Sequence, residues 1–244
     1  MSAFCIKPAG ELALTVNFGE QISPALNARV RALDALLSAE ACPGVVEAVP
    51  AYSALTVHYD PERIGYADMR ALLARLAAQS LDASPAPEAV VELPVLYGGD
   101  AGPDLDFVCA HSGLSRDEVI ALHAGRDYLI YLLGFTPGFP YLGGLDERLH
   151  TPRLETPRTR IPAGSVGIAG GQTGVYPSDT PGGWRIIGRT PVRLYDPQRS
   201  APILLRPGES IRFVPIEPMQ YRQIEAEEAE GRYVCRRYGK GAGL

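Results

Sequence analysis

The sequence has little from which a metal centre, a disulfide framework or a membrane span could be built. Its four cysteines are scattered without a Cys-x-x-Cys pair, and its four histidines do not cluster with them. This spacing argues against a structural zinc site and favours reduced, buried thiols. No apolar run approaches the roughly 20 residues of a membrane helix, and the N-terminus lacks the pattern of a signal peptide. We therefore expect a cytoplasmic protein with no metal and no membrane contact.

Lysine is also scarce, so that nearly all basic charge is carried by arginine. The net charge of −5 argues against nucleic-acid binding. The charge is uneven, with ten acids against two bases from Glu88 to Glu147 and ten arginines against four acids from Arg148 to Arg212. Arginine suits bidentate recognition of carboxylate or phosphate, although each one can equally pair with a surface acid.

The first 80 residues have the pattern of a small α+β domain. Two pairs of β-rich runs, each followed by a helical pattern, give the order ββα-ββα, which predicts an antiparallel sheet covered by two helices. The first helix follows Ser23-Pro24, and the second is expected from Tyr66 to Ala78. A Pro/Ala/Ser-rich segment then marks a domain boundary. We expect domains at 1–82 and 90–244, joined by a linker at 83–89.

The second part is rich in short β runs separated by Gly and Pro. Ser115 and Glu118 form a capping box that begins a helix ending at Gly125, and DYLIYLLGF is an apolar strand. The later runs SVGIAGG, WRIIGRT, VRLYD, APILL and SIRFVPI predict strands of a β-barrel or sandwich. A closing helix is expected from Glu217 to Glu230.

The stretch LGFTPGFPYLGG, residues 133–144, combines six Gly or Pro residues with three aromatics. Its Pro content predicts neither helix nor strand. We interpret it as an ordered loop in which Phe135, Phe139 and Tyr141 either plug the end of the barrel or form a wall for a substrate or partner.

Two Gly-rich motifs resemble known sites only in part. Residues 163–167, AGSVG, are the nearest match to the Gly-x-Ser-x-Gly pattern of a serine-nucleophile elbow, with Ala163 at the first Gly position, but no helix is expected after them and no histidine follows in the chain. Residues 167–174, GIAGGQTG, are either an anion-binding nest or a tight turn, because they lack the Lys of a P-loop. No nucleotide-binding motif is visible.

The segment from Pro152 to Pro191 concentrates groups that bind a small, polar, planar molecule. It offers guanidinium, amide, hydroxyl and indole groups but few carboxylates and no histidine. General-base catalysis must therefore come from elsewhere or from a partner. His123 is a candidate general acid or base, or it complements the C-terminal dipole of its helix. The groups of the segment are Arg153, Arg158, Arg160, Arg185, Arg189, Gln172, Thr173, Tyr176, Ser178 and Trp184.

Long motifs give the chain a resemblance to a known family. GFTPGFPYLGGLD, PRLETPRTRIPAGSVGIAGGQTGVYP and TPGGWRIIGRTP closely resemble the family of 5-oxoprolinase B-type subunits, also called the KipI or allophanate hydrolase subunit 1 family. The resemblance covers nearly the whole chain. It implies a ferredoxin-like N-terminal domain followed by a mainly-β, cyclophilin-like barrel.

The resemblance also implies a function. The expected role is that of the B-type subunit of a bacterial 5-oxoprolinase, which opens the lactam of 5-oxoproline to glutamate with ATP hydrolysis, alongside A-type and C-type subunits. The chain is expected to be inactive alone, with ATP bound by a partner or at an interface. The alternatives are a KipI-like inhibitor of a sporulation histidine kinase and a carboxyltransferase component acting on urea- or allophanate-type substrates.

Residue chemistry then suggests roles within such a site. An amide oxygen gains negative charge as the lactam reacts, and donors around it are effective in a dry site. We expect Gln172, Thr173 and Tyr176 to face the amide, with His123 as acid or base. Arg153, Arg158 and Arg189 are expected to hold an anionic group, and Phe139, Tyr141 and Trp184 to wall the cleft.

Overall fold

The computed structural model describes residues 3–82 and 89–239 of the chain. It divides the chain into two compact units, Met1–Ala86 and Pro87–Leu244. Most of the segment expected as a linker, residues 83–88, lies outside the described residues. No helix in the described part of the chain is long and apolar enough to cross a membrane.

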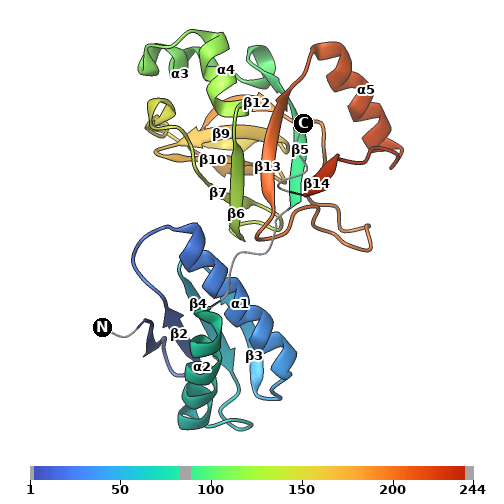
Figure 1. The fold of residues 1–244 in the computed structure, drawn as a ribbon. Coiled ribbons are helices and arrows are strands. Elements are labelled where there is room, and N and C mark those ends of the chain that lie inside the picture. The colour runs from blue at the N-terminus through green and yellow to red at the C-terminus, as the bar shows by residue number, and fades with distance from the viewer. Residues whose placement is uncertain (1–2, 83–88, 240–244) are drawn as a thin grey trace. The chain divides into compact units, whose positions relative to one another are not determined.

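Unit 1 is an antiparallel sheet with two helices, in the order expected from the sequence (Figure 1). The strands are arranged β1-β2-β4-β3. Leu14, Val16, Leu55 and Val57 alternate along the two central strands and are fully buried against the helices, as the period of two requires. The elements are β1 (Cys5–Pro8), β2 (Ala13–Asn17), α1 (Pro24–Glu40), β3 (Val45–Pro50), β4 (Ala54–Tyr59) and α2 (Tyr66–Ser80).

The start of α1 follows the expected use of proline but not of serine. Pro24 occupies the first turn, where a missing N–H costs nothing, whereas the Ser23 side chain makes no capping hydrogen bond. The element order of unit 1 also differs from the βαββαβ order of a ferredoxin-like fold, because an edge strand comes first in the chain.

Unit 2 is built around an eight-stranded sheet that curls into a nearly closed barrel (Figure 1). The strands run in the order β10-β9-β12-β5-β13-β6-β7, and β14 pairs with β5. Strands β5 and β13 are parallel, and the other pairs are antiparallel. The two ends of the sheet approach each other, since the backbone of Gly174 in β10 lies beside Phe139 and Pro140 at the start of β7. The strands are β5 (Ala89–Tyr97), β6 (Asp127–Leu133), β7 (Pro140–Gly143), β9 (Ser165–Ala169), β10 (Gln172–Val175), β12 (Arg185–Arg189), β13 (Ser210–Pro215) and β14 (Arg237–Gly239).

The remaining elements of unit 2 lie around the barrel. Helix α4 begins with the expected capping box, in which Ser115 and Glu118 bond to each other's backbone N–H. Strands β8 and β11 form a separate two-stranded ribbon. The other elements are η1 (Gly99–Ala101), α3 (Leu105–Ser112), α4 (Arg116–Ala124), η2 (Glu147–Leu149), β8 (Arg158–Ile161), β11 (Thr180–Gly182) and α5 (Pro218–Ala229).

The prediction of two strands, at VRLYD and APILL, is wrong. The runs VRLYD and APILL form a loop whose only ladder contact is an isolated bridge between Tyr195 and Ile203. Pro191, Pro197 and Pro202 flank or interrupt these runs and remove backbone donors that a longer ladder would need.

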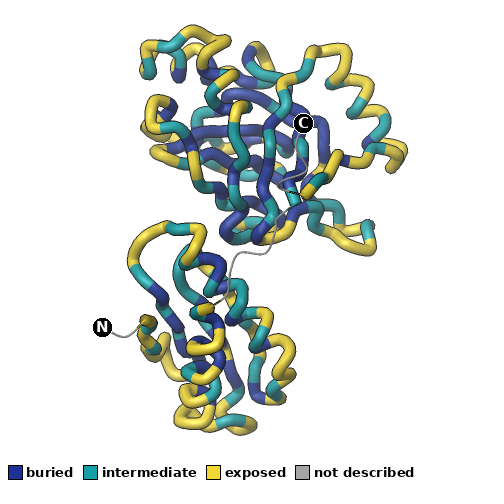
Figure 2. The backbone as a smooth tube through the Cα atoms, viewed as in Figure 1, coloured by how far each residue is buried: buried dark blue, intermediate teal, exposed yellow. Residues whose placement is uncertain are grey.

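Many strand residues of the barrel are buried (Figure 2), and their apolar side chains form one core cluster. Tyr128, Ile130, Ile211 and Phe213 are almost completely buried there. Consecutive residues of the sheet therefore face two different environments, the packed interior or the outer face. This alternation decides which side chains can reach a ligand.

Candidate functional site

A cleft of about 190 Å³ lies on the outer face of the barrel, where the β8–β11 ribbon approaches β10 and β12. Six residues that the sequence indicated as site residues line it together with Phe135 and the Pro181–Gly183 segment. At roughly 30 Å³ per water, this volume accommodates about six water-sized groups. The six residues are Phe139, Tyr141, Arg153, Gln172, Tyr176 and Trp184.

The walls of the cleft are aromatic. The Phe139 ring lies 5.4 Å from that of Tyr176 and 5.7 Å from that of Trp184, in both cases edge to face. Tyr141 adds a further edge-to-face contact with Phe139 at 5.3 Å. Phe139, Tyr176 and Trp184 are almost fully buried, so that their positions are fixed by packing. They present a rigid apolar surface to a small ring.

Glycines make room for these rings. A Cβ at Gly182 would lie 2.6 Å from the Tyr176 hydroxyl, and one at Gly174 would lie 3.0 Å from the Trp184 ring. The Gly-rich composition of this segment thus follows from close approach of backbone to aromatic side chains.

Strand alternation places the polar groups. Val175 packs in the barrel interior, whereas Tyr176 belongs to the outer aromatic cluster, and Gln172 likewise lines the cleft while Thr173 is buried on the opposite side. The Gly170-Gly171 turn between β9 and β10, with Gly170 at φ 55°, confirms the tight-turn interpretation of GIAGGQTG. Ser165 starts β9 and is followed by a strand, so the expected absence of an elbow helix is confirmed.

Two polar side chains at the cleft have defined charge states. Burial raises the pKa of the Tyr176 phenol to about 12, although the nearby guanidinium of Arg153 and the Trp184 backbone oppose this shift. Tyr176 is therefore a neutral donor at physiological pH. Arg153 is exposed and makes no hydrogen bond or ion pair with any described residue. The cleft thus combines a neutral donor with an uncompensated positive charge.

The stretch 133–144 is a hairpin rather than a loop throughout. Its second half forms β7, which pairs with β6, so the expectation that it contains no strand is wrong. Gly134 and Phe139 close the turn through a backbone hydrogen bond of 3.1 Å. Phe135 has φ 65° and is 69% exposed at the mouth of the cleft, whereas Phe139 is buried. The two phenylalanines therefore differ: Phe139 is buried in the cluster with Tyr176 and Trp184, whereas Phe135 is exposed to solvent.

His123 and Thr173 lie inside the barrel, away from the cleft. The Tyr97 hydroxyl is 2.7 Å from His123 Nδ1, and His123 Nε2 is 2.8 Å from Thr173 Oγ1. Because Thr173 donates to the Gly167 carbonyl, it accepts from Nε2–H, which fixes the tautomer and leaves Nδ1 to accept from Tyr97. The imidazole also stacks on Phe213 at 4.5 Å. The network is complete, and it indicates a structural role for both residues.

The buried imidazole predicts a specific loss of stability in acid. Burial lowers the pKa of His123 to about 3, while an unfolded histidine titrates near 6.5. Below pH 6.5 the unfolded state therefore binds a proton on His123 that the folded state does not bind. The contribution of neutral His123 to the free energy of unfolding is present above pH 6.5 and is lost as the pH falls toward 3. Between pH 6 and pH 4.5 the loss is expected to be about 2 kcal/mol.

Urea unfolding at several pH values, followed by Trp184 fluorescence, measures this slope. His123→Gln is expected to remove the His123 contribution to the slope, and the exposed His58 provides the matched control His58→Gln. An unchanged slope in His123→Gln would contradict the assignment.

Arg158 and Arg189 also lie outside the cleft. Arg158 donates to both oxygens of Asp104, at 2.8 and 2.9 Å, and to the Trp184 carbonyl at 3.4 Å. Asp104 is buried and additionally accepts from the Ile186 N–H at 2.6 Å. Arg158 thus helps to fix the position of the Trp184 backbone through this hydrogen bond. Arg189 donates from Nε to the Ala163 carbonyl at 3.0 Å and lines another pocket.

Asp104 is a residue near the cleft to which the sequence assigned no role. Asp104 stands in an acidic stretch 54 residues from Arg158, and no local pattern connects them. Phe135, which the sequence indicated as a plug or a wall residue, lines the cleft and is exposed.

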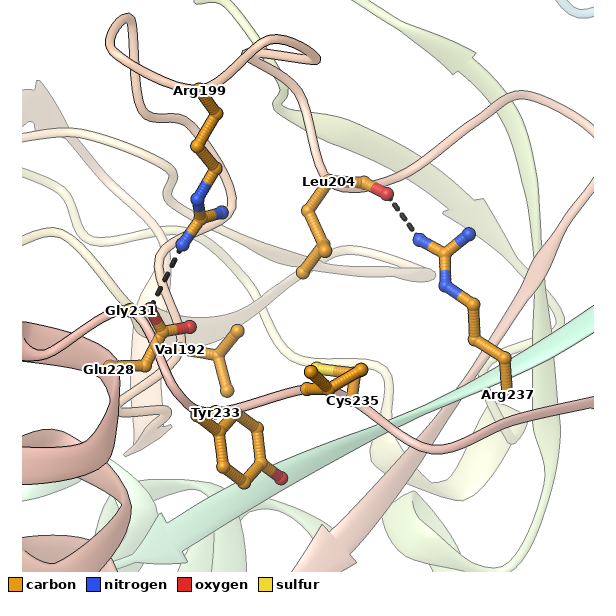
Figure 3. Close-up of a pocket in the computed structure, with 9 residues that line it drawn as sticks. Val192, Arg199, Leu204, Glu228, Gly231, Tyr233, Cys235 and Arg237 are labelled. Carbon is orange, nitrogen blue, oxygen red and sulfur yellow. Dashed lines mark hydrogen bonds and ion pairs between the residues drawn. The ribbon is translucent and has the colours of Figure 1, made fainter.

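Another cavity, of about 260 Å³, lies near the C-terminal strand (Figure 3). Its arginines are already neutralised, because Arg199 bonds to Glu228 at 2.9 Å and Arg237 to Glu209 at 2.9 Å. Burial raises the pKa of the Cys235 thiol to about 12, which keeps it protonated and unreactive. Within residues 3–82 and 89–239, no group of three or more His, Cys, Asp or Glu side chains could hold a metal.

Comparison with known proteins places the chain in a family. Residues 4–205 match the family model described as carboxyltransferase domain, subdomain C and D. The chain is 42% identical over 232 residues to the 5-oxoprolinase B-type subunit of Bacillus subtilis (strain 168), covering 91% of this chain and 97% of the relative. It is 53% identical over 174 residues to the 5-oxoprolinase B-type subunit of Escherichia coli O157:H7, covering 71% of this chain and 79% of the relative.

A solved structure adds a similarity in fold. The crystal structure of TTHA0988 matches with a TM-score of 0.75 and 43% identity over 84% of this chain. The match covers only 40% of the TTHA0988 chain, so that protein carries further sequence of its own. Through both its family model and its relatives, the chain belongs to the carboxyltransferase subdomain C and D family, within the group that includes the B-type subunits of 5-oxoprolinase.

Proposed function

We propose that the chain is the B-type subunit of an ATP-dependent 5-oxoprolinase, which opens the lactam of 5-oxoproline to glutamate together with A-type and C-type subunits. The relatives that carry this name, at 42% and 53% identity, support this function. The observation that carries it is the aromatic cleft with one unpaired arginine and one neutral phenol donor. The complex would work in the cytoplasm, where ATP is available.

The chemistry of the substrate suits the cleft. 5-Oxoproline is a five-membered lactam that bears one carboxylate. The guanidinium of Arg153 would bind the carboxylate, since arginine matches its planar geometry. Tyr176 and Gln172 would face the lactam carbonyl, and the faces and edges of Phe139 and Trp184 would enclose the ring.

The cleft supplies binding and electrostatic stabilisation but no proton acceptor. The described residues that line it include no carboxylate and no imidazole. A donor aimed at the amide oxygen stabilises the charge that develops there, yet attack on the carbonyl also needs an activated nucleophile. That group and the ATP site would come from the partner proteins, and the chain alone would be inactive.

The fold relationships implied by the sequence belong to the same proposal. Unit 1 would be a rearranged ferredoxin-like domain, whose edge strand precedes the βαββα elements rather than following them. Unit 2 would be a cyclophilin-like barrel, with the boundary between the domains at residues 83–89.

Reconstitution tests the function. The chain is combined with the A-type and C-type proteins from the same organism, and 5-oxoproline-dependent ATP hydrolysis and glutamate formation are measured. Both are expected only when all three proteins are present. Absence of turnover in the complete mixture, with all three proteins folded, would reject the proposal.

Gln172→Ala is expected to lower kcat about tenfold in that mixture, since the loss of one neutral hydrogen bond is worth up to about 1.5 kcal/mol. Tyr176 would still donate to the amide. Gln198→Ala, in an exposed loop outside the cleft, is the matched control. Equal activities of the two variants would remove Gln172 from the site.

The family model favours one alternative. Its description as a carboxyltransferase domain suggests transfer of a carboxyl group from a biotinylated carrier to a urea-type amide. Both substrates present an N–C=O group to the same donors. Biotin-dependent carboxylation of urea by the reconstituted complex, without 5-oxoproline turnover, would favour this alternative.

A further inference from the structure

A second pocket, of about 240 Å³, lies on the outer face of the barrel between η1, β8, β9 and β12. Ile161 and Ile186 line it and belong to the same aromatic cluster whose other side chains wall the cleft. None of the residues lining this pocket lines the cleft. It is therefore a separate space, with room for about eight water-sized groups.

Ser165 lines this pocket with a hydroxyl that has no hydrogen-bond partner among the described residues. The residue is only 2% exposed. Its Oγ is not among the fully buried side-chain atoms that lack a partner, so the hydroxyl remains accessible from the pocket and can bond to a ligand there. A ligand atom in the pocket would satisfy it.

Arg189 stands directly opposite Ser165, in register on the neighbouring antiparallel strand. Side chains of such a pair share one face of the sheet, with Cβ atoms about 5 Å apart. Arg189 Nε donates to the Ala163 carbonyl, which holds the guanidinium in place. Its two Nη groups make no hydrogen bond or ion pair with any described residue, so that they are available to bind a ligand.

The other charges around the pocket are largely balanced. Arg158 is paired with Asp104 and Arg160 with Asp179. Asp100 lines the pocket as well, but it is exposed in η1 and its charge is screened by solvent. Arg189 makes no ion pair with any described residue, and it also lines the neighbouring pocket beside α5, where Glu225 and Glu228 lie.

The rest of the lining is apolar. Ala101, Pro103 and Pro162 lie there with the two isoleucines. A fully polar ion would satisfy the donors but leave this surface uncovered. A ligand with a short apolar body would cover it as well.

We propose that this pocket binds a small oxyanion carrying a short apolar body, with the head group on Arg189 and Ser165 and the body against Ile161 and Ile186. The head group is a carboxylate or a phosphate, since guanidinium and hydroxyl recognise both. The site is distinct from the cleft, and its existence does not depend on the reaction of the complex.

NMR titration of the ¹⁵N-labelled full chain tests the proposal. The probes are butyrate, inorganic phosphate and butylamine at constant ionic strength. Butyrate is expected to shift the amides of residues 164–165 and 189–190 in a saturable manner. Phosphate reports whether the head group alone suffices, and butylamine, which has the same body and the opposite charge, is expected to have no effect.

Three variants localise the binding. Arg189→Gln is expected to weaken butyrate binding at least tenfold, because charge-assisted hydrogen bonds are lost. Ser165→Ala is a smaller change that should preserve the fold and weaken binding several-fold. Arg153→Gln, the matched arginine of the cleft, is expected to leave this affinity unchanged.

Two results would overturn the proposal. One is saturable binding that Ser165→Ala and Arg189→Gln leave unchanged, or that Arg153→Gln abolishes. The other is the absence of saturable shifts at 164–165 and 189–190 with both butyrate and phosphate.

Discussion

Replacing Arg153 with alanine is expected to lower kcat/KM for 5-oxoproline about 100-fold in the reconstituted complex, which corresponds to about 2.7 kcal/mol. Among the arginines of the Pro152–Pro191 segment, Arg153 is the one that lines the cleft, and it has no described hydrogen-bond partner to lose. Its removal should therefore leave the carboxylate of the substrate unpaired without disturbing the fold. Steady-state kinetics with varied 5-oxoproline measure the effect.

Two further variants separate charge from geometry. Arg153→Lys retains the charge but not the planar fork, so it should recover only part of the activity. Arg222→Ala in α5 removes another exposed arginine outside the cleft and should have no effect. If Arg153→Ala kept full kcat/KM, the carboxylate would bind elsewhere.

Asp104→Ala is expected to destabilise unit 2 by about 3 kcal/mol, in the range measured when one partner of a buried ion pair is removed. The Asp104 side chain is only 9% exposed, and it binds both Arg158 and the Ile186 N–H. Its loss would leave a half-buried guanidinium and a buried N–H without partners. Urea unfolding followed by fluorescence reports this locally, because Trp184 is the single tryptophan and Arg158 contacts its carbonyl.

Asp106→Ala is the matched control for this prediction. Asp106 also forms an ion pair with an arginine, Arg116, but its side chain is 81% exposed. Exposed pairs contribute about 1 kcal/mol or less. Equal destabilisation by the two substitutions would show that the Asp104–Arg158 pair has no special role in unit 2.

The sequence was most informative where local pattern decides structure. The hydrophobic periods of α1 and α2 and the capping box of α4 depend on residues a few positions apart, and all three helices form. The cleft could be predicted in part, because its aromatics and polar groups come from motifs of unusual composition.

The remaining features depend on tertiary contacts that no window of sequence contains. Gln172 and Thr173 are neighbours in sequence but face opposite sides of β10, and this required knowing which face is the barrel interior. Arg158 resembled a ligand-binding residue until Asp104 was placed beside it. The sequence does not predict β7, because Pro137 and Pro140 argue against a strand. Proline is nevertheless tolerated in an edge strand such as β7.

The packed interior of the barrel has an evolutionary consequence. His123, Tyr128 and Phe213 pack together in the lumen, whereas the cleft and the Arg189 pocket lie on the outer face beside the β8–β11 ribbon. Substitutions in the ribbon can therefore alter what is bound while the barrel keeps its core. A lineage could acquire new ligands by exchanging this covering sequence alone, as occurs when function resides in segments supported by a rigid scaffold.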